Sequence, residues 1–321
     1  MMSSPRLLYL DQNAWIALAH GAWDATAHPA EHSALMRVVK AVQGQRIIVP
    51  LSFTNIYETA KINDPLRRRH LAHVQSTISG GKVIRSRRRI FGDTLLQHIA
   101  RRSALPPPVL ADGWFLSDLW FEAAADYTPE TYGFEISERA LDLMRQDPAY
   151  ALFSYLCETD EAVRLEGVRQ YSASSAELLL KLDARRKLAA GEAFALRLRA
   201  YGAQLILEEL DFIFLTAKRL GLSWYSVGDI GRSLLRSIVT EVPVMNIERE
   251  LAVRLEDQQR ETNENDLRDM LSFTTALPVA DILVGEKAFV GLARQAKLGE
   301  KYDVVLLTKV MDLTDDLLSA A

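Results

Sequence analysis

The chain has 321 residues, of which 49% are hydrophobic and 25% charged, and its formal net charge at pH 7 is −4. These values are ordinary for a globular protein with a substantial core, and they exclude a disordered chain. The apolar stretches all fall short of the roughly 20 residues that span a bilayer.

The same composition indicates a compartment. Cys157 is the single cysteine, which excludes an internal disulfide, and the N-terminus lacks the pattern of a secretion signal. We therefore expect a cytoplasmic protein without membrane association. The six histidines lie between His20 and His98 without the His and Cys spacing of a zinc site, so zinc is not expected.

The first part of the chain alternates strands and helices. Residues 6–10 (RLLYL) and 46–50 (RIIVP) are predicted to be buried strands, and the apolar spacing between them predicts a helix over residues 33–44, ended by Gly44. A further helix is expected within residues 51–64, capped by Ser52 or Thr54 and closed before Pro65. Strand, helix, strand and helix at these lengths indicate a parallel α/β unit.

Positive charge is concentrated after this unit. Lys61 to Arg102 contains 11 Lys and Arg against 2 Asp and Glu, a local balance of +9, whereas the rest of the chain carries −13. Such a stretch attracts a polyanion that the net charge would not, although a solvated basic helix face is an equally good interpretation. The stretch contains two arginine triplets, Arg67, Arg68 and Arg69, and Arg87, Arg88 and Arg89.

The middle of the chain is helical and the α/β pattern returns after it. Residues 105–113 (LPPPVLADG) predict a rigid loop, and residues 114–260 have long helical patterns. Helices are then expected at 265–277 and 287–297, with strands at 280–286 and 302–308. We therefore predict one α/β domain, made of residues 1–90 and 261–321, that carries an all-helical insertion over residues 91–260.

Acidic residues recur at the ends of the predicted strands. Asp11 ends the first strand, and ligands of open parallel sheets bind outside the carboxyl ends of the strands. Glu58 lies in the helix after the second strand, and Glu286 follows the strand at 280–286. Two of them also have a simpler interpretation, because Asp11 can cap the next helix and Glu58 can reach solvent.

Three further carboxylates lie within the 20 residues before Glu286. Asp266 and Asp269 are three residues apart on a predicted helix and share a face. Asp281 stands at the beginning of the strand that Glu286 ends. An acidic residue that leads into a buried apolar strand is harder to explain as a surface position.

The order of these motifs resembles the PIN-like nuclease domain. The matching segments are YLDQNAW with Asp11, SFTNIYETAK with Glu58, DMLSFTTAL with Asp269 and ILVGEKAF with Glu286, and together they cover under half of the chain. The chain departs from the usual pattern by a Glu at the fourth position, and by a second aspartate, Asp266, beside the third. The resemblance implies a three-layer fold with a central parallel sheet, bound Mg²⁺ or Mn²⁺, and nuclease activity, more often on RNA.

Phosphodiester hydrolysis explains why carboxylates would converge. Mg²⁺ or Mn²⁺ lowers the pKa of bound water and stabilises charge on the phosphate, and it takes oxygen ligands. Without the metal, clustered carboxylates repel one another and at least one is expected to hold a proton. The predicted catalytic residues are Asp11, Glu58, Asp269 and Glu286, and the predicted metal ligands are these four with Asp266 and Asp281.

Polar and basic side chains near these positions are candidates for substrate binding. Asn13, Ser52 and Thr54 have groups that can hydrogen-bond to a phosphate, although helix capping explains each of them as well. The six arginines of the two triplets are expected to hold the nucleic-acid backbone, which positions a substrate without reading its sequence. Trp15, Trp23 and Trp114 are expected in the core or at an interface.

Other functions stay open. A PIN-like module that binds nucleic acid or protein without cleaving it would lack the metal. A phosphatase of the haloacid dehalogenase type would need an aspartate where Asn13 stands, and a GxxxxGK loop for nucleotide triphosphates is absent. We expect a ribonuclease of the toxin or defence-effector kind, whose insertion binds a protein partner, covers the site or forms a homodimer.

Overall fold

The computed structural model describes residues 4–188, 191–258 and 260–319, so the ends of the predicted α/β domain and residues 189–190 and 259 of the predicted insertion lie outside the described residues. Within the described residues, four parallel strands form a sheet in the order β2-β1-β5-β6. They are β1 (Arg6–Leu10), β2 (Ile47–Ile48), β5 (Ile282–Val284) and β6 (Val305–Leu307). All four strands were expected, and the mixed α/β class is confirmed, although three of the strands are shorter than predicted.

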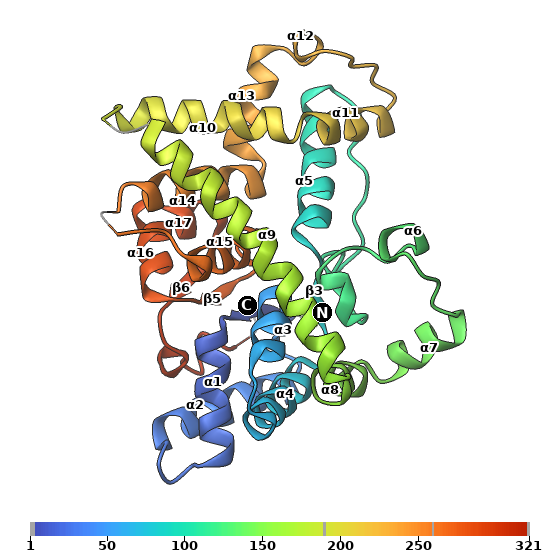
Figure 1. Cartoon of the computed structure of the whole chain (residues 1–321), viewed down its shortest axis with the longest axis vertical. Helices are drawn as coiled ribbons and strands as arrows, with labels where there is room; N and C mark the ends of the chain where they lie inside the picture. The colour runs from blue at the N-terminus through green and yellow to red at the C-terminus, as the bar shows by residue number, and fades with distance from the viewer. Residues whose placement is uncertain (1–3, 189–190, 259, 320–321) are drawn as a thin grey trace.

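The sheet lies between two layers of helices. Side chains alternate along a strand. Leu8 and Leu10 accordingly pack in one apolar cluster with the helices α1 (Gln12–Trp23), α2 (Pro29–Gln43) and α4 (Pro65–Ser79). Leu7 and Tyr9 pack in another cluster with the helices α14 (Pro243–Glu256), α15 (Glu264–Ala276) and α16 (Lys287–Gln295). Figure 1 shows the first set of helices below the sheet and the second set above it. The result is a three-layer α/β/α core.

Helices make up most of the remaining chain, and a short antiparallel pair, β3 (Val83–Ile84) with β4 (Leu116–Ser117), was not expected from the sequence. The α-helices are α1 (Gln12–Trp23), α2 (Pro29–Gln43), α3 (Phe53–Lys61), α4 (Pro65–Ser79), α5 (Arg87–Arg102), α6 (Pro129–Tyr132), α7 (Glu138–Gln146), α8 (Pro148–Glu158), α9 (Glu161–Leu188), α10 (Phe194–Glu208), α11 (Leu210–Arg219), α12 (Val227–Ile230), α13 (Arg232–Glu241), α14 (Pro243–Glu256), α15 (Glu264–Ala276), α16 (Lys287–Gln295) and α17 (Leu298–Tyr302). The 3₁₀ helices are η1 (Trp120–Ala123) and η2 (Val310–Asp312).

Local sequence explains where the helices near the sheet begin and end. Ser52 caps α3, and the Asn55 side-chain oxygen accepts a hydrogen bond from the Ser52 backbone N–H, which completes a capping box. Gly44 caps the C-terminus of α2, as predicted. Asp64 caps α4, whose first residue is Pro65. The capping box at Ser52 determines where α3 starts and therefore which of its side chains face the edge of the sheet.

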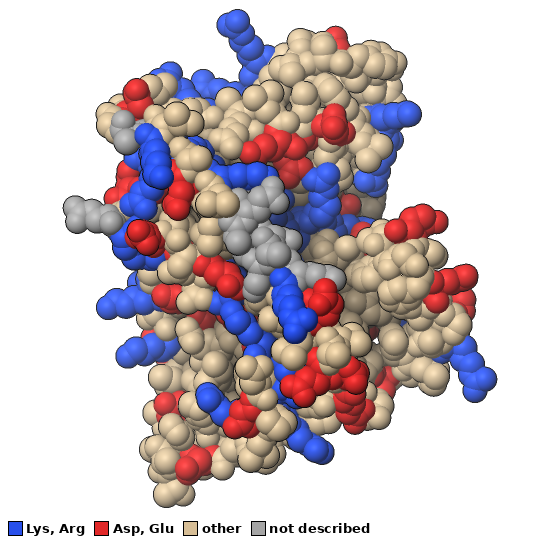
Figure 2. Space-filling model, in the orientation of Figure 1, with Lys and Arg blue, Asp and Glu red and all other residues tan. Residues whose placement is uncertain are grey.

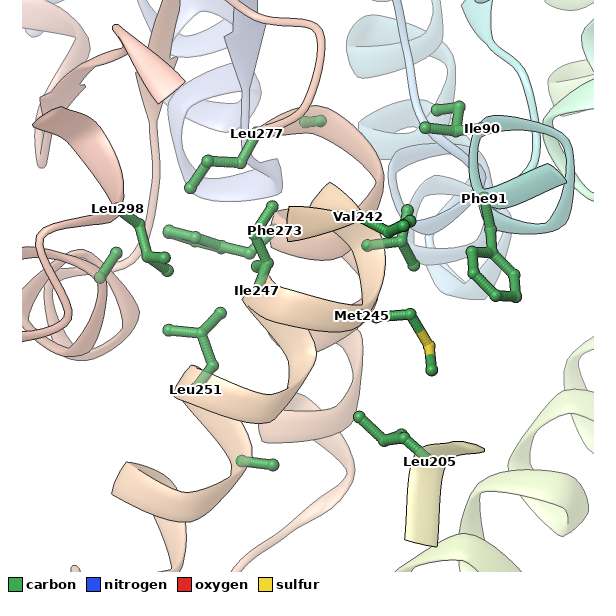
Figure 3. Close-up of a cluster of buried hydrophobic side chains, with 14 of the residues drawn as sticks. Ile90, Phe91, Leu205, Val242, Met245, Ile247, Leu251, Phe273, Leu277 and Leu298 are labelled. Atoms are coloured by element: carbon green, nitrogen blue, oxygen red, sulfur yellow. The ribbon is translucent and has the colours of Figure 1, made fainter. Parts of the chain in front are cut away.

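The helical middle of the chain packs into the same core as the sheet. Figure 3 shows α14 with Met245 on the side of Phe91 of α5 and with Ile247 and Leu251 on the side of Phe273 of α15, and all five belong to one buried cluster that also contains residues of β1 and β5. The predicted boundary at residue 90 falls inside α5. The structure thus joins the insertion to the α/β core through a common hydrophobic interior.

One long helix crosses the outside of this arrangement. Figure 1 shows α9 running diagonally in front of the molecule between α8 and α10, and it contacts both α3 and α15. Arg164 of α9 donates a hydrogen bond to the Ala60 carbonyl of α3, and Arg186 donates one to the Arg260 carbonyl just before α15. Within the described residues, no helix has the length and apolar character needed to cross a membrane.

Candidate active site

Four predicted carboxylates meet in one cavity of about 360 Å³. Its lining includes Asp11, Glu58, Asp269 and Glu286, which come from four separate segments of the chain. Asp11 directly follows β1, and Glu286 lies two residues after the end of β5; the two strands are parallel neighbours in the sheet, so they end at the same edge. We call this space the carboxylate cavity.

Asp11 is both a helix cap and a member of the cavity. Its backbone N–H donates to the Val284 carbonyl of β5 at 2.9 Å, and its Oδ1 accepts from the Ala14 N–H at 2.8 Å. The capping contact occupies one oxygen of the carboxylate. Both sequence interpretations of Asp11 therefore describe the same side chain.

Burial and neighbouring negative charges affect the protonation of Asp11. Burial, the hydrogen bond from Ala14 and the negative charges of Glu58 and Glu286 together set the pKa of Asp11 at about 7: burial and the two charges raise it, and the hydrogen bond lowers it. The direction of this shift is the one expected for clustered carboxylates without a bound cation.

Asp269 and Glu286 lie close enough to affect one another's protonation. Two carboxyl groups can form a hydrogen bond only when one of them holds a proton. Burial raises the pKa of Asp269 far above its ordinary value, and the bond to Glu286 and the charges of Glu286 and Asp11 add to that rise. A divalent cation would replace the proton as the group that allows both carboxylates to approach.

Glu58 has a different neighbour, which sequence reasoning missed. Arg268 lies 2.9 Å from Glu58 Oε1 through its Nε, and its Nη1 lies 2.6 Å from Glu264. Arg268 and Lys61 both line the carboxylate cavity and offset part of its negative charge. Burial raises the pKa of Glu58, while the charge of Arg268 and its hydrogen bond oppose the rise. The available signals were the adjacency of Arg268 to Asp269 and the spacing of three between Glu58 and Lys61.

Two of the predicted metal ligands do not line this cavity. Asp266 is buried at the start of α15, where it accepts a hydrogen bond from the Asn263 N–H at 2.8 Å and pairs with Arg260. Asp281 accepts from the Leu7 N–H at 2.6 Å, at the end of β5 opposite to Glu286. Asp266 therefore binds a backbone N–H and an arginine, and Asp281 binds a backbone N–H, outside the carboxylate cavity.

The three predicted hydroxyl and amide contacts are divided between two spaces. Asn13 lines the carboxylate cavity, and Thr54 lines both this cavity and a neighbouring one of about 290 Å³. Ser52 lines only the second space, which we call the hydroxyl cavity. A chain of hydroxyls runs along it, from Ser52 to Thr54 at 2.7 Å and from Thr54 to Ser272 at 2.7 Å.

The second arginine triplet is not a free basic surface, which corrects the interpretation of the basic stretch. Arg87 pairs with Glu248 at 2.5 Å, and Arg88 pairs with Glu209. Arg89 pairs with Asp93 and Asp126, at 2.5 and 3.0 Å. Figure 2 shows the same mixture on a larger scale, with Lys and Arg interspersed among Asp and Glu over the visible face. Of this triplet, Arg87 and Arg88 line the hydroxyl cavity.

The first triplet does not line the hydroxyl cavity, and one of its arginines lines a third cavity. Arg67 lines a cavity of about 280 Å³ together with Trp23 and His70, which we call the Trp23 cavity. Arg68 donates to the Ile62 carbonyl at 2.6 Å, and the Arg69 guanidinium lies 6.0 Å from the centre of the Phe153 ring. Neither Arg68 nor Arg69 lines a cavity next to the carboxylates.

The tryptophans also differ from one another. Trp15 is fully buried, as expected, and Trp114 is partly buried against the main cluster. Trp23 was expected in the core or at an interface, but it is 51% exposed. Nothing in its sequence context distinguished it from Trp15, which is two helical turns earlier on α1.

The donor set of the carboxylate cavity fits a hard divalent cation. Mg²⁺ takes oxygen ligands and keeps several waters, so it needs only one or two carboxylates from the protein. Across the described ranges, no group of three or more His, Cys, Asp or Glu side chains is placed to hold a metal ion. The four carboxylates thus share one cavity without forming a complete cage.

Comparisons with models of protein families, with curated proteins and with solved structures gave no match for this chain.

Proposed function

We propose that the protein is a metal-dependent nuclease with a PIN-like core that hydrolyses phosphodiester bonds in RNA. The observation that carries this proposal is the meeting of Asp11, Glu58, Asp269 and Glu286 in one cavity at the carboxyl edge of the parallel sheet. These four were selected by motif order alone, and they come from segments up to 275 positions apart. Their convergence in one cavity is difficult to explain if they are four unrelated, solvent-exposed acidic residues.

The arrangement of the core supports the PIN-like part of the proposal. The first strand lies in the middle of the sheet between β2 and β5, and the carboxylates follow β1 and β5 or lie on α3 and α15. Helices cover both faces of the sheet. The resemblance implies a three-layer core with a central parallel sheet, and this arrangement of strands and helices supports the proposal.

Different side chains of the cavity would bind the cation and the phosphate. Asp269 and Glu286 would hold Mg²⁺ or Mn²⁺ with Asp11, and each must release any proton it carries when the cation binds. The bound ion would lower the pKa of a water molecule and stabilise charge on the scissile phosphate. Arg268 and Lys61 present positive charge in the same cavity, where they would attract the phosphate and where they oppose the rise in the pKa of Glu58.

A cleavage assay tests the proposal. Labelled single-stranded RNA is incubated with the wild type and with Asp11→Asn, in Mg²⁺, in Mn²⁺ and in EDTA. We expect cleavage by the wild type in metal only, and a loss of at least 100-fold in the variant because the ligand set has lost a charge. Asp142→Asn, an exposed position on α7, is the matched control and should cleave like the wild type. Cleavage that survives EDTA or Asp11→Asn would refute the proposal.

A catalytically silent PIN-like module is the second candidate. It is favoured by the ion pair between Arg268 and Glu58, which already supplies Glu58 with a positive partner, and by the incomplete ligand cage. Metal binding separates the two candidates. A nuclease should show a rise in melting temperature with Mn²⁺ that disappears in Asp269→Asn, whereas a silent module should show no rise in either protein.

A further inference from the structure

Three cavities adjoin along one face of α3. The carboxylate cavity shares Thr54 and Ser272 with the hydroxyl cavity, and it shares Ile16 and Ile62 with the Trp23 cavity. Thr54 lies in the first turn of α3, Ile62 caps its end, and Glu58 lies midway between them. Positions spaced by four share a helix face, and at about 1.5 Å per residue the two ends are about 12 Å apart. The carboxylates therefore have a separate cavity on each flank.

The Trp23 cavity presents a fixed aromatic ring. Trp23 stacks on His70 with ring centres 4.1 Å apart and an interplanar angle of 15°, and its Nε1 donates to the His70 carbonyl at 3.2 Å. Half of the Trp23 side chain nevertheless remains exposed, and Arg67 lines the same cavity. A held but accessible indole beside a cation is the arrangement on which unpaired bases stack.

The hydroxyl cavity presents a cation held in place. The Arg88 guanidinium lies 3.5 Å from the centre of the Phe212 ring and pairs with Glu209, yet its side chain remains 54% exposed. Arg88, Ser52 and Thr275 line the cavity, whereas Glu209 is not among its lining residues. Guanidinium and hydroxyl groups are the usual contacts of a backbone phosphate.

We propose that these flanking cavities are two subsites for one single-stranded nucleic acid, with a base stacked at Trp23 and a backbone phosphate held at Arg88. A duplex would not fit this pair of subsites, because its bases are already stacked on one another. A strand bound on both flanks places an internal phosphodiester at the carboxylates. The inference rests on the proposed function only for that last placement.

Binding of a fluorescent single-stranded RNA, measured by anisotropy over a range of salt concentrations, tests both subsites. The buffer contains Ca²⁺, and electrophoresis confirms that the RNA remains intact. Trp23→Ala should weaken binding about 10-fold without changing the salt dependence, because stacking releases no counterions. Arg88→Gln should lower the slope of log K against log salt by about 0.7, the value for one phosphate contact on a single strand.

Two matched variants control for loss of an exposed aromatic ring or arginine elsewhere. Tyr225→Ala removes a ring that is 85% exposed outside the three cavities, and Arg101→Gln removes an exposed arginine from the far end of α5. Both should bind like the wild type. Trp23→Leu keeps an apolar cover on His70 without a stacking face, so it replaces Trp23→Ala if that variant does not fold.

Further RNA and DNA probes show which ligand the subsites take. Double-stranded RNA of the same sequence should bind at least 10-fold more weakly than the single strand, and single-stranded DNA shows whether the sugar matters. Equal binding of the duplex, or no effect of either variant, would overturn the two subsites. A slope change that requires a 5′-phosphate would assign Arg88 to a strand end and overturn the internal placement.

The nuclease proposal and the two subsites can fail independently. Cleavage in Mg²⁺ or Mn²⁺ is measured in parallel with the same RNA. Binding with the expected response of both variants but without cleavage supports the subsites and refutes the nuclease. Cleavage with unchanged binding in both variants refutes the subsites and leaves the nuclease proposal standing.

Discussion

At the scale of single residues, two aspartates three positions apart on α15 have opposite roles. Asp266 is buried, caps its own helix and pairs with Arg260, whereas Asp269 lies in the carboxylate cavity beside Glu286. The sequence placed both on one helix face and left their order open. What separated them is the capping box with Asn263, whose signal was already present in the spacing of three between Asn263 and Asp266.

The two aspartates should therefore respond differently to removal of their charge. Asp269→Asn should raise the free energy of unfolding of the metal-free protein by about 1 kcal/mol at pH 9, because it relieves repulsion at the cost of function. Asp266→Asn should lower it by up to about 1 kcal/mol, because it weakens the helix terminus and leaves Arg260 without its charged partner. Urea unfolding of both variants measures this difference. Destabilisation by Asp269→Asn would contradict the account.

The pH dependence of stability follows from the same groups. The folded-state pKa of Asp11 is raised to about 7 and that of Asp269 is raised well above its ordinary value, so the folded protein keeps protons that the unfolded chain releases near pH 4. The stabilisation is complete below the unfolded pKa values and is lost as pH rises through the folded ones. The melting temperature of the metal-free protein should fall between pH 5 and pH 9, and Asp269→Asn should flatten that fall.

Metal binding should show the reverse trend. A cation must displace the protons held by Asp11 and Asp269, so its stabilising effect should increase from pH 6 to pH 9. The rise in melting temperature produced by a fixed Mn²⁺ concentration measures this effect. A rise that is the same at every pH would mean that the cation binds somewhere other than at these carboxylates.

At the scale of secondary-structure elements, Gly285 sets the distance between β5 and α15. It stands between Val284 and Glu286, and a Cβ at this position would lie 3.0 Å from the Phe273 ring and from Leu283. Phe273 is on the same helix as Asp269, one turn further along. The close approach of strand and helix therefore controls how near Glu286 comes to Asp269.

Gly285→Ala should consequently disturb both the packing and the site. We expect a loss of about 1–3 kcal/mol in the free energy of unfolding, as for other overpacked positions, and reduced cleavage of RNA. Gly291→Ala on α16 is the matched control, because a Cβ there meets open space, and it should stabilise the protein by up to about 1 kcal/mol. Equal behaviour of the two variants would show that the contact with Phe273 does not constrain the site.

The elements near the sheet were the part of the fold that the sequence predicted best. The strands of the parallel sheet are short apolar runs bounded by polar residues, and Ser52 and Gly44 are strong local signals for helix ends. The strands β3 and β4 were missed because Val83–Ile84 is an isolated apolar pair between Lys82 and Arg85, and Leu116–Ser117 closely follows the expected loop at residues 105–113, whereas the equally short β2 lies in a longer apolar run. Arg268 was missed, and Lys61 was named only as the start of the basic stretch, because a charged residue on a helix does not reveal which partner it meets.

At the scale of the whole molecule, the helical middle of the chain is joined to the α/β core. Leu251 of α14 is fully buried in the cluster that also contains Leu7, Tyr9 and Leu283 of the sheet. Sequence patterns predicted that residues 91–260 are helical, but they could not show which helix faces pack against the sheet layer. That information depends on contacts between residues far apart in the chain.

A common core predicts a single unfolding transition. Scanning calorimetry should give a calorimetric enthalpy equal to the van't Hoff enthalpy for the wild type. Leu251→Ala should lower the stability of the entire chain by about 2–5 kcal/mol, because it leaves a cavity in the shared interior. Two separate transitions, with only one shifted by Leu251→Ala, would instead mean that the insertion folds as an independent domain.

The central claim is that the carboxylates brought together at the sheet edge bind a divalent cation. Electron paramagnetic resonance of Mn²⁺ titrated with the protein tests this most directly, because it reports bound and free ion without requiring a substrate. We expect one bound Mn²⁺ in the wild type and in Asp266→Asn, and binding weakened at least 10-fold in Asp269→Asn. Binding that is lost in Asp266→Asn but retained in Asp269→Asn, or no binding at all, would contradict it.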